Sequence, residues 1–199
     1  MYTRFGGHNQ GRCFQLKREG LFDSLINMMK TEKKTLGIIA DTHENMPAIS
    51  RAVEIFNERD VNCVLHAGDF ISPLTANPLS KLKSELIGVF GNNDGDRLFL
   101  RKSFEEENIG RINRDPHRFE ISGTQILLMH QPKFLDILQE SGWGGVVVYG
   151  HTHRVDVREG KPLILNPGEC GGWLTGRSSI GILDLEEREV EIIDLDIKT

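Results

Sequence analysis

The sequence repeats one short pattern four times: an apolar run of the kind that forms a buried strand ends directly in residues with metal-binding side chains. The four segments are residues 38–43 (IIADTH), 64–69 (VLHAGD), 89–94 (VFGNND) and 148–153 (VYGHTH). A fifth apolar run, at 126–129, ends at His130. Binding sites of open α/β sheets collect at the carboxyl ends of the strands. We therefore expect these five ends to gather their side chains in one crevice.

The spacing within two of these segments favours shared binding places. Asp41 and His43 are two residues apart, and so are His151 and His153. In an extended backbone, side chains two residues apart leave the strand on the same side. We therefore expect each pair to point at one place.

The donor atoms exceed the needs of a single ion. The candidate ligands are two carboxylates, one amide oxygen and four imidazoles, from Asp41, Asp69, Asn92, His43, His130, His151 and His153. Because one ion takes about four to six ligands, the set predicts two divalent metal ions. Nitrogen and oxygen ligation without thiolate favours transition metals over Mg²⁺ or Ca²⁺, which prefer oxygen shells. Mn²⁺ is the first choice, with Ni²⁺, Co²⁺, Fe²⁺ and Zn²⁺ as alternatives.

Alternating strand and helix patterns predict an α/β fold. The expected strands are 36–40, 63–67, 85–90, 118–121, 125–129, 146–149, 155–158 and 163–165, followed by a hairpin over 179–196. The expected helices are 47–58, 75–82, 96–108 and 133–140. The second half is mostly β, which indicates antiparallel strands after an α/β opening. We therefore expect two β-sheets packed together with helices outside.

Residues 1–34 differ from the rest of the chain, because they lack sustained periodicity and mix glycine and polar residues with scattered charges. We expect a dispensable N-terminal extension over 1–34 and a single domain over 35–199. Met28 and Met29 lie just before the boundary, which is consistent with an upstream start codon. The alternative is a short helix at 21–29 that docks on the domain.

Composition argues against several classes of protein. The formal net charge is −5 and no dense block of Lys and Arg is present, which disfavours a protein that coats nucleic acid or an anionic membrane. No stretch approaches the roughly 20 apolar residues of a membrane span. The three cysteines are widely spaced and cannot all pair within one chain, which fits a reducing compartment. We expect a cytoplasmic protein with small-molecule partners; whether it forms a homo-oligomer stays open.

In their order along the chain, the motifs Asp-x-His, Gly-Asp, Gly-Asn-x-Asp, a lone His and Gly-His-x-His resemble those of the calcineurin-like metallophosphoesterase superfamily. The resemblance spans residues 35–199, and the segment 166–170 (NPGEC) is similar to a loop of small single-domain phosphodiesterases of bacteria and archaea. It implies a four-layer αββα sandwich of two mixed sheets, with Asp69 bridging two metal ions. One ion would be held by Asp41, His43 and His153, and the other by Asn92, His130 and His151.

The resemblance further implies hydrolysis of aryl or nucleotide-type phosphodiesters by a hydroxide that bridges the two ions, with Asn92 and Asn93 contacting the substrate. Many members of the superfamily carry histidine at the position of Asn93, where it contacts phosphate or protonates the leaving oxygen. Asparagine can donate a hydrogen bond but cannot act as a general acid. We therefore expect a preference for diesters with good leaving groups.

Four further polar residues receive structural interpretations. His66 lies inside an expected strand, so we expect a hydrogen-bonded supporting or core residue. Asp94 and Asp96 precede a helix and are expected to cap it, since carboxylates suit a helix N-terminus. Cys170 lies in a glycine-rich loop with no apparent base, so a nucleophilic role is not expected.

Two rival functions stay open on the sequence alone. The retromer complex contains a subunit with this fold and degraded metal ligands, which makes a protein-interaction scaffold one alternative, although the ligand set is intact here. A DNA nuclease of the same superfamily is the other. Such nucleases resemble longer chains, and no basic groove interleaved with aromatic residues is evident in this sequence.

Overall fold

The computed structural model describes residues 34–197, so the expected extension over 1–34, save its last residue, and the alternative helix at 21–29 lie outside the described residues. The first half of the described part alternates strand and helix: β1 (Thr35–Ile39), α2 (Met46–Glu58), β2 (Cys63–His66), the 3-10 helix η1 (Pro73–Thr75), α3 (Ala76–Leu79), β3 (Glu85–Val89), α4 (Arg97–Glu106) and β4 (Gly110–Asn113). The second half is mostly β: β5 (His117–Ile121), β6 (Thr124–Leu128), α5 (Leu135–Glu140), β7 (Val146–Val148), β8 (Val155–Arg158), β9 (Leu163–Pro167), β10 (Ser179–Asp184) and β11 (Glu189–Asp194).

The strands form two mixed sheets. The first sheet has the order β11-β10-β1-β2-β3-β4, in which β1 to β4 are parallel and the β10–β11 hairpin is antiparallel. The second sheet has the order β5-β6-β7-β9-β8, and its three inner strands β6, β7 and β9 are parallel. The expectation of an antiparallel second half is therefore wrong for these strands. Parallel neighbours need a crossover, which α5 provides between β6 and β7.

The sequence patterns also missed β4 and overestimated the helix at 75–82. β4 is a short strand at the edge of the first sheet, and its sequence GRIN carries a single large apolar residue. Of the helix expected at 75–82, only Ala76–Leu79 is α-helical, and it follows the 3-10 turn η1. Elements this short bury too little apolar surface to leave a periodic signal.

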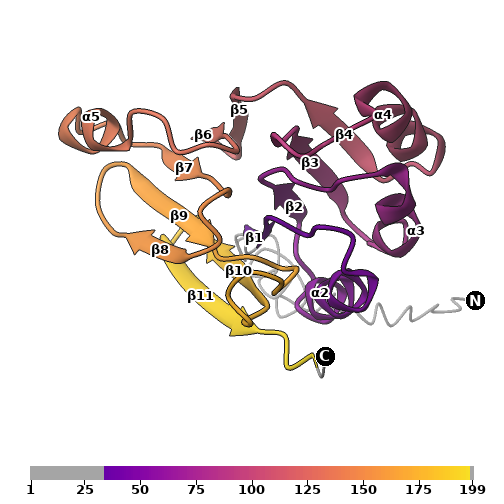
Figure 1. Cartoon of the computed structure of the whole chain (residues 1–199). Coiled ribbons are helices and arrows are strands. Elements are labelled where there is room, and N and C mark those ends of the chain that lie inside the picture. The colour runs from indigo at the N-terminus through magenta and orange to yellow at the C-terminus, as the bar shows by residue number, and fades with distance from the viewer. Residues whose placement is uncertain (1–33, 198–199) are drawn as a thin grey trace, which may run out of the picture. The chain divides into compact units, whose positions relative to one another are not determined.

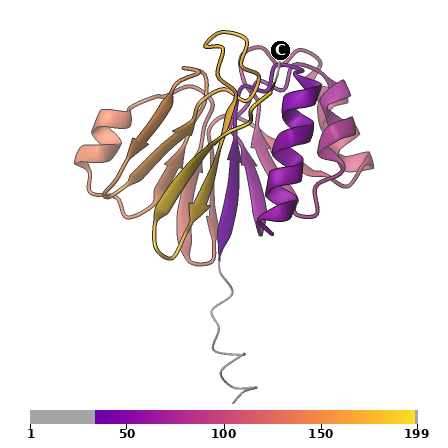
Figure 2. The same cartoon turned by 90° about the horizontal axis from the view of Figure 1, so that it is seen from below.

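The sheets pack face to face between helices. Helices α2, α3 and α4 lie on the outer side of the first sheet and α5 on that of the second (Figures 1 and 2). Alternation along β1 sends Leu36 and Ile38 into the core between the sheets, and Ile39 into the core beneath the helices. The expected αββα sandwich is confirmed.

Helix α2 illustrates how local sequence sets these layers. The side chain of Asn45 accepts a hydrogen bond from the backbone N–H of Ala48, and proline occupies the first turn, so the helix begins where the sequence indicates. Its buried face carries Ile49, Val53 and Phe56 into the core beneath the helices.

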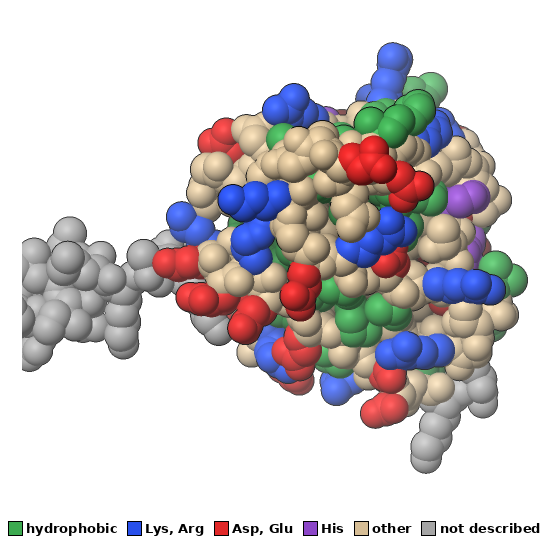
Figure 3. Space-filling view, turned by 90° about the vertical axis from the view of Figure 1, so that its left-hand side faces the viewer, with side chains coloured by type: hydrophobic (Ala, Val, Ile, Leu, Met, Phe, Trp, Pro, Cys, Tyr) green, Lys and Arg blue, Asp and Glu red, His purple; other side chains and the backbone are tan. Residues whose placement is uncertain are grey.

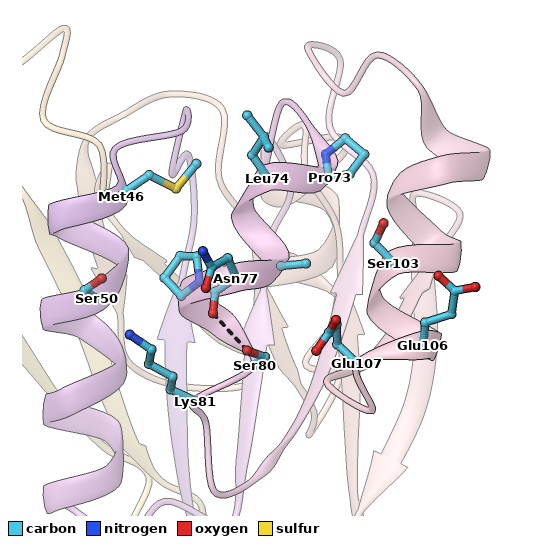
Figure 4. A pocket seen from close by; sticks show the side chains of 12 residues that line it. Met46, Ser50, Pro73, Leu74, Asn77, Ser80, Lys81, Ser103, Glu106 and Glu107 are labelled. Atoms are coloured by element: carbon cyan, nitrogen blue, oxygen red, sulfur yellow. Dashed lines mark hydrogen bonds between the residues drawn. The ribbon is translucent and has the colours of Figure 1, made fainter.

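A cavity of about 560 Å³ lies on the helical side, among α2, α3 and α4 (Figure 4). Its lining includes Met46, Lys81 and Glu107 but none of the seven candidate ligands. The metal-binding chemistry therefore lies elsewhere on the molecule.

The surface view in Figure 3 shows Lys and Arg interspersed with Asp and Glu, with histidine side chains reaching the surface at the right-hand edge. This face offers no extended basic stripe for nucleic acid. Among the described residues, no helix combines the length and apolar character needed to cross a membrane.

Candidate metal centre

All seven candidate ligands follow strand ends at one edge of the sandwich. The contributing strands are β1, β2 and β3 of the first sheet and β6 and β7 of the second, whose carboxyl ends lie at the upper edge in Figure 2. The sheets meet there, so side chains from both converge. The expected crevice therefore draws on both sheets.

Two compact sets of potential donor atoms occur at this edge. Asp41, His43 and His153 form one set, and Asp41, Asp69 and His130 form the other. The Oδ2 atom of Asp69 lies 3.6 Å from Nε2 of His43 and 3.5 Å from Nε2 of His130. One carboxylate oxygen thus lies between an imidazole of each set.

The hydrogen bonds of His130 fix its tautomer. Its Nδ1 lies 2.8 Å from the carbonyl oxygen of Ala67, which can only accept, so Nδ1 carries a proton, and Nε2 is the nitrogen that a neutral ring offers to a cation. That Nε2 faces the side-chain oxygen of Asn92 at 2.8 Å. Both atoms can act as metal ligands, so this pair fits a metal ion that binds both.

The imidazoles of the other set are also arranged for a cation. Nε2 of His43 is buried and has no hydrogen-bond partner within the described part of the chain. Nδ1 of His153 donates to the Glu169 carboxylate at 2.6 Å, and its Nε2 lies on the other side of the ring, 3.8 Å from Oδ1 of Asp41. A buried polar atom without a partner is costly, and a metal ion would satisfy it.

His151 lies beside these sets without joining either. Its ring is 5.0 Å from the ring of His130, in an edge-to-face arrangement, and its backbone N–H donates to the Asp41 carboxylate. His153 instead stacks on His43 with ring centroids 5.0 Å apart. The expectation that His151 and His153 point at one place is therefore wrong.

The backbone explains this error. Asp41, His43, His151 and His153 all have positive φ, between 42° and 68°, and are not extended. The chain leaves each strand through a tight left-handed turn, so two-residue alternation no longer applies. Such conformations are unfavourable for residues other than glycine, and they concentrate here at the candidate site.

Glycine is required where the Asp69 and Asn92 loops meet. A Cβ on Gly91 would lie within van der Waals overlap of the Asp69 carboxylate and backbone. Gly68 has φ of +94°, a region that other residues rarely adopt. These two positions let the β2 and β3 loops approach closely enough to share the centre.

Asn93 holds the carboxylate of Asp69 in this arrangement. Its backbone N–H donates to Oδ1 and its side-chain amide to Oδ2, each at 2.8 Å. The carboxylate is thereby fixed in orientation, with Oδ2 between His43 and His130. Asn93 is itself exposed, and the second N–H of its amide remains available to a ligand.

Burial makes this cluster unfavourable without cations. Burial, followed by repulsion from Asp69, raises the pKa of Asp41 to about 8. Burial also lowers the pKa of His43, against the attraction of Asp69, and lowers the pKa of His151. Two buried carboxylates close together, beside imidazoles whose charged form burial disfavours at His43 and His151, form an environment that divalent ions stabilise.

His66 supports the centre without facing it. Its Nδ1 accepts from the backbone N–H of Gly68, and Nε2 lies 3.3 Å from the hydroxyl of Thr42. The ring stacks on Phe70 at 3.5 Å between centroids, and burial lowers its pKa well below the usual value. The interpretation of a hydrogen-bonded supporting residue is confirmed.

Asp94 and Asp96, which follow Asn92 and Asn93 in the sequence, have different roles. Asp96 caps α4, because its side chain accepts from the N–H of Phe99, as expected. Asp94 does not cap the helix: its buried carboxylate accepts from the N–H groups of Ile71 and Gly91 and ties two loops together. Its role depends on a tertiary contact 23 residues away in sequence.

Cys170 is buried, and burial strongly raises the pKa of its thiol. A thiolate nucleophile is therefore disfavoured at this position, in agreement with the sequence interpretation.

Glu169 is a functional residue that the sequence reasoning missed. Its carboxylate binds Nδ1 of His153 and also accepts from the N–H groups of Leu174 and Thr175. Although burial raises the pKa of Glu169, the hydrogen bonds from Thr175 and His153 outweigh it and lower the pKa. A carboxylate behind a ligating imidazole fixes its tautomer and increases its basicity. The only signal was its position in the NPGEC segment.

We expect Glu169→Gln to weaken Mn²⁺ binding and hydrolysis about 10- to 100-fold, because His153 loses the partner that fixes its tautomer. Calorimetric titration with Mn²⁺ measures the affinity. Thr175→Val is the matched control, since it removes the hydroxyl contact to Glu169 but retains the His153 contact. Equal losses of affinity in both variants would mean that Glu169 only stabilises the loop.

With this geometry in view, comparison with known proteins defines the class. Residues 35–188 match the family model of the calcineurin-like phosphoesterase superfamily domain. The chain belongs to this superfamily, as its motifs indicate, and is a phosphoesterase.

Individual relatives and solved structures also resemble this chain. A phosphodiesterase of Methanocaldococcus jannaschii is 40% identical over 164 residues, covering 81% of this chain and 99% of the relative. A solved structure of an archaeal phosphodiesterase aligns with a TM-score of 0.75 at 38% identity, over 80% of this chain and 99% of that chain. Vacuolar protein sorting 29 of Cryptosporidium parvum aligns with a TM-score of 0.54 at 21% identity, over 81% and 96%. The last likeness is one of fold alone.

Proposed function

We propose that this protein is a phosphodiesterase that uses two divalent metal ions. One ion would be held by Asp41, His43 and His153, the other by Asn92, His130 and His151, and Asp69 would bridge them. The proposal is supported by a homologous phosphodiesterase at 40% identity and by the superfamily, which implies divalent metals.

The observation that carries most weight is the opposition of His130 and Asn92. The Nε2 of His130 and the side-chain oxygen of Asn92 are both metal-ligating atoms and lie 2.8 Å apart, while the contact to Ala67 places a proton on Nδ1 and leaves the Nε2 of a neutral ring free to bind a cation. The buried, unpartnered Nε2 of His43 is the corresponding feature of the other set. Both features favour metal binding over a metal-free scaffold, a function that is supported only by the similarity of fold.

When bound, two such ions withdraw charge from phosphoryl oxygens and lower the pKa of a coordinated water. The chain's own residues position the reactants. Asn93 holds the Asp69 carboxylate, and the second N–H of its exposed amide would donate to the substrate. Asn92 would likewise contact the phosphoryl group from its exposed position. Neither residue donates a proton as an acid, so the leaving group must be stable as an anion.

The mixed imidazole and carboxylate donor set without thiolate favours transition metals as a class, and among them Mn²⁺ is our first choice. Ni²⁺, Co²⁺, Fe²⁺ and Zn²⁺ are compatible with the same donors. The net charge of two ions with Asp41 and Asp69 is positive, which attracts a phosphodiester to an otherwise acidic protein.

The test is a matrix of metals and substrates. Demetallated protein is reconstituted with each of these ions or with Mg²⁺, then assayed on bis(p-nitrophenyl) phosphate and on alkyl and aryl monoesters. We expect aryl diester hydrolysis with at least one transition metal. A tenfold or greater preference for alkyl monoesters would contradict the role assigned to Asn93, and absence of both metal uptake and hydrolysis would favour a scaffold.

A further inference from the structure

A second cavity, of about 360 Å³, adjoins the metal centre. Asn92 and His130 line it, so it shares two side chains with the candidate ligand set. Phe90, Arg97 and Arg114 also line it. A molecule bound at the metal centre can therefore extend into a space that carries two guanidinium groups.

Within the described residues, Arg97 and Arg114 form no ion pair with a carboxylate. Arg114 is exposed, and among residues 34–197 it has no ion pair or hydrogen bond to another side chain. Arg97 donates to the backbone oxygens of Gly91 at 2.7 Å and Asp94 at 3.3 Å, which fixes its guanidinium and leaves other N–H groups free.

The guanidinium of Arg101 is a third positive group close to this cavity, because it lies over the Phe90 ring that lines the cavity. The guanidinium groups of Arg97 and Arg101 lie 5.3 Å and 5.5 Å from the centre of the Phe90 ring. Elsewhere, Arg59 and Arg177 each pair with a carboxylate within 3 Å. Three guanidinium groups are thus gathered at one place in a chain of net charge −5.

The nearby carboxylates are already engaged with the backbone. Asp115 lines the cavity, and its Oδ1 accepts from the N–H of His130 at 2.9 Å. Asp94 accepts from the N–H groups of Ile71 and Gly91. Three guanidinium groups against these two carboxylates leave a positive surplus, which fits an anionic ligand, because guanidinium groups bind phosphate oxygens with paired N–H donors.

We propose that this cavity binds a second phosphate group carried on one arm of the diester substrate, with Arg114 and the free N–H groups of Arg97 as its donors. This inference rests on the proposed function, since it requires the scissile phosphate to lie at the metal centre. The substrate class is then a phosphodiester that ends in a phosphomonoester, such as a phosphorylated nucleoside ester.

The test uses two substrates that differ only in this group: thymidine 5′-(p-nitrophenyl phosphate) and its 3′-phosphorylated form. With the Mn²⁺-loaded protein at low salt, we expect kcat/KM to be about tenfold higher for the phosphorylated substrate. Arg114→Gln should remove most of this ratio, and Arg114→Lys should retain part of it, because lysine preserves charge but not the paired donors.

Arg51→Gln is the matched control, because Arg51 is an exposed arginine on α2 that does not line the cavity. It should keep the wild-type ratio. A wild-type ratio near one, or a ratio unchanged in Arg114→Gln, would overturn the second phosphate site while leaving the phosphodiesterase assignment intact.

Binding separates the two proposals if no hydrolysis is found. Calorimetry then compares thymidine 3′,5′-bisphosphate with thymidine 5′-monophosphate on the same metal-loaded protein. A roughly tenfold tighter Kd for the bisphosphate, lost in Arg114→Gln, supports the cavity as a phosphate site independently of catalysis. Equal Kd values would reject it.

Discussion

Asp69→Asn should lower hydrolysis of bis(p-nitrophenyl) phosphate by at least about 10³-fold with every metal tested. The reason is the position of the Asp69 carboxylate, whose Oδ2 lies within 3.6 Å of Nε2 on both His43 and His130. An amide in its place removes the negative charge that links the two donor sets. Metal content per chain, measured by mass spectrometry after dialysis, should fall below two.

Asp60→Asn is a suitable control for this experiment. Asp60 is exposed, lies outside both donor sets, and has a φ of 51°, a conformation that asparagine tolerates well. It should match wild type in activity and metal content. Full activity of Asp69→Asn, with a wild-type circular dichroism spectrum, would overturn the bridging role.

Asp41→Asn should have opposite effects on the metal-free and the metal-loaded protein. Burial and the neighbouring Asp69 raise the pKa of Asp41 to about 8 in the folded chain, from 3.8 for an ordinary aspartate. Between these values the folded state binds more protons than the unfolded state, so stability falls as pH rises from about 4 to 8. Asparagine removes this cost.

The measurement is thermal unfolding in a chelator from pH 5 to 8.5. We expect the Tm of wild type to decrease with pH, and that of Asp41→Asn to be flatter and at least about 5 °C higher at pH 8. With saturating Mn²⁺ the order should reverse, because binding stabilises only a chain that retains the ligand. A lower Tm for the variant in chelator at pH 8 would show that Asp41 is stabilising without metal.

Much of the fold was predictable because burial leaves a periodic signal. β1 is an apolar run and α2 has a proline in its first turn, so both were found near their true bounds. β4 and the parallel pairing of β6, β7 and β9 were not found. A strand's partners depend on crossovers and on the neighbouring sheet, which local periodicity does not record.

The candidate site shows the same division. Its donor residues were recognisable because each follows an apolar strand, and strand ends of α/β sheets converge. Their mutual arrangement was only partly recognisable: Asp41 and His43 share a donor set as expected, but positive φ at His151 and His153 separates two side chains that an extended chain would keep together. Glu169 and Asp94 contribute through hydrogen bonds to His153, Gly91 and Ile71, contacts that exist only after folding.

The sequence by itself determined the chemistry of this protein: which atoms can bind metal, that they exceed one ion's needs, and that Asn93 cannot supply an acidic proton. The tertiary structure decided which imidazole faces which carboxylate, how each tautomer is fixed, and that arginines gather beside the centre. The physical reason is that side-chain chemistry belongs to each residue. Proximity, burial and hydrogen-bond partners arise only when distant strand ends are brought to one edge of the sandwich.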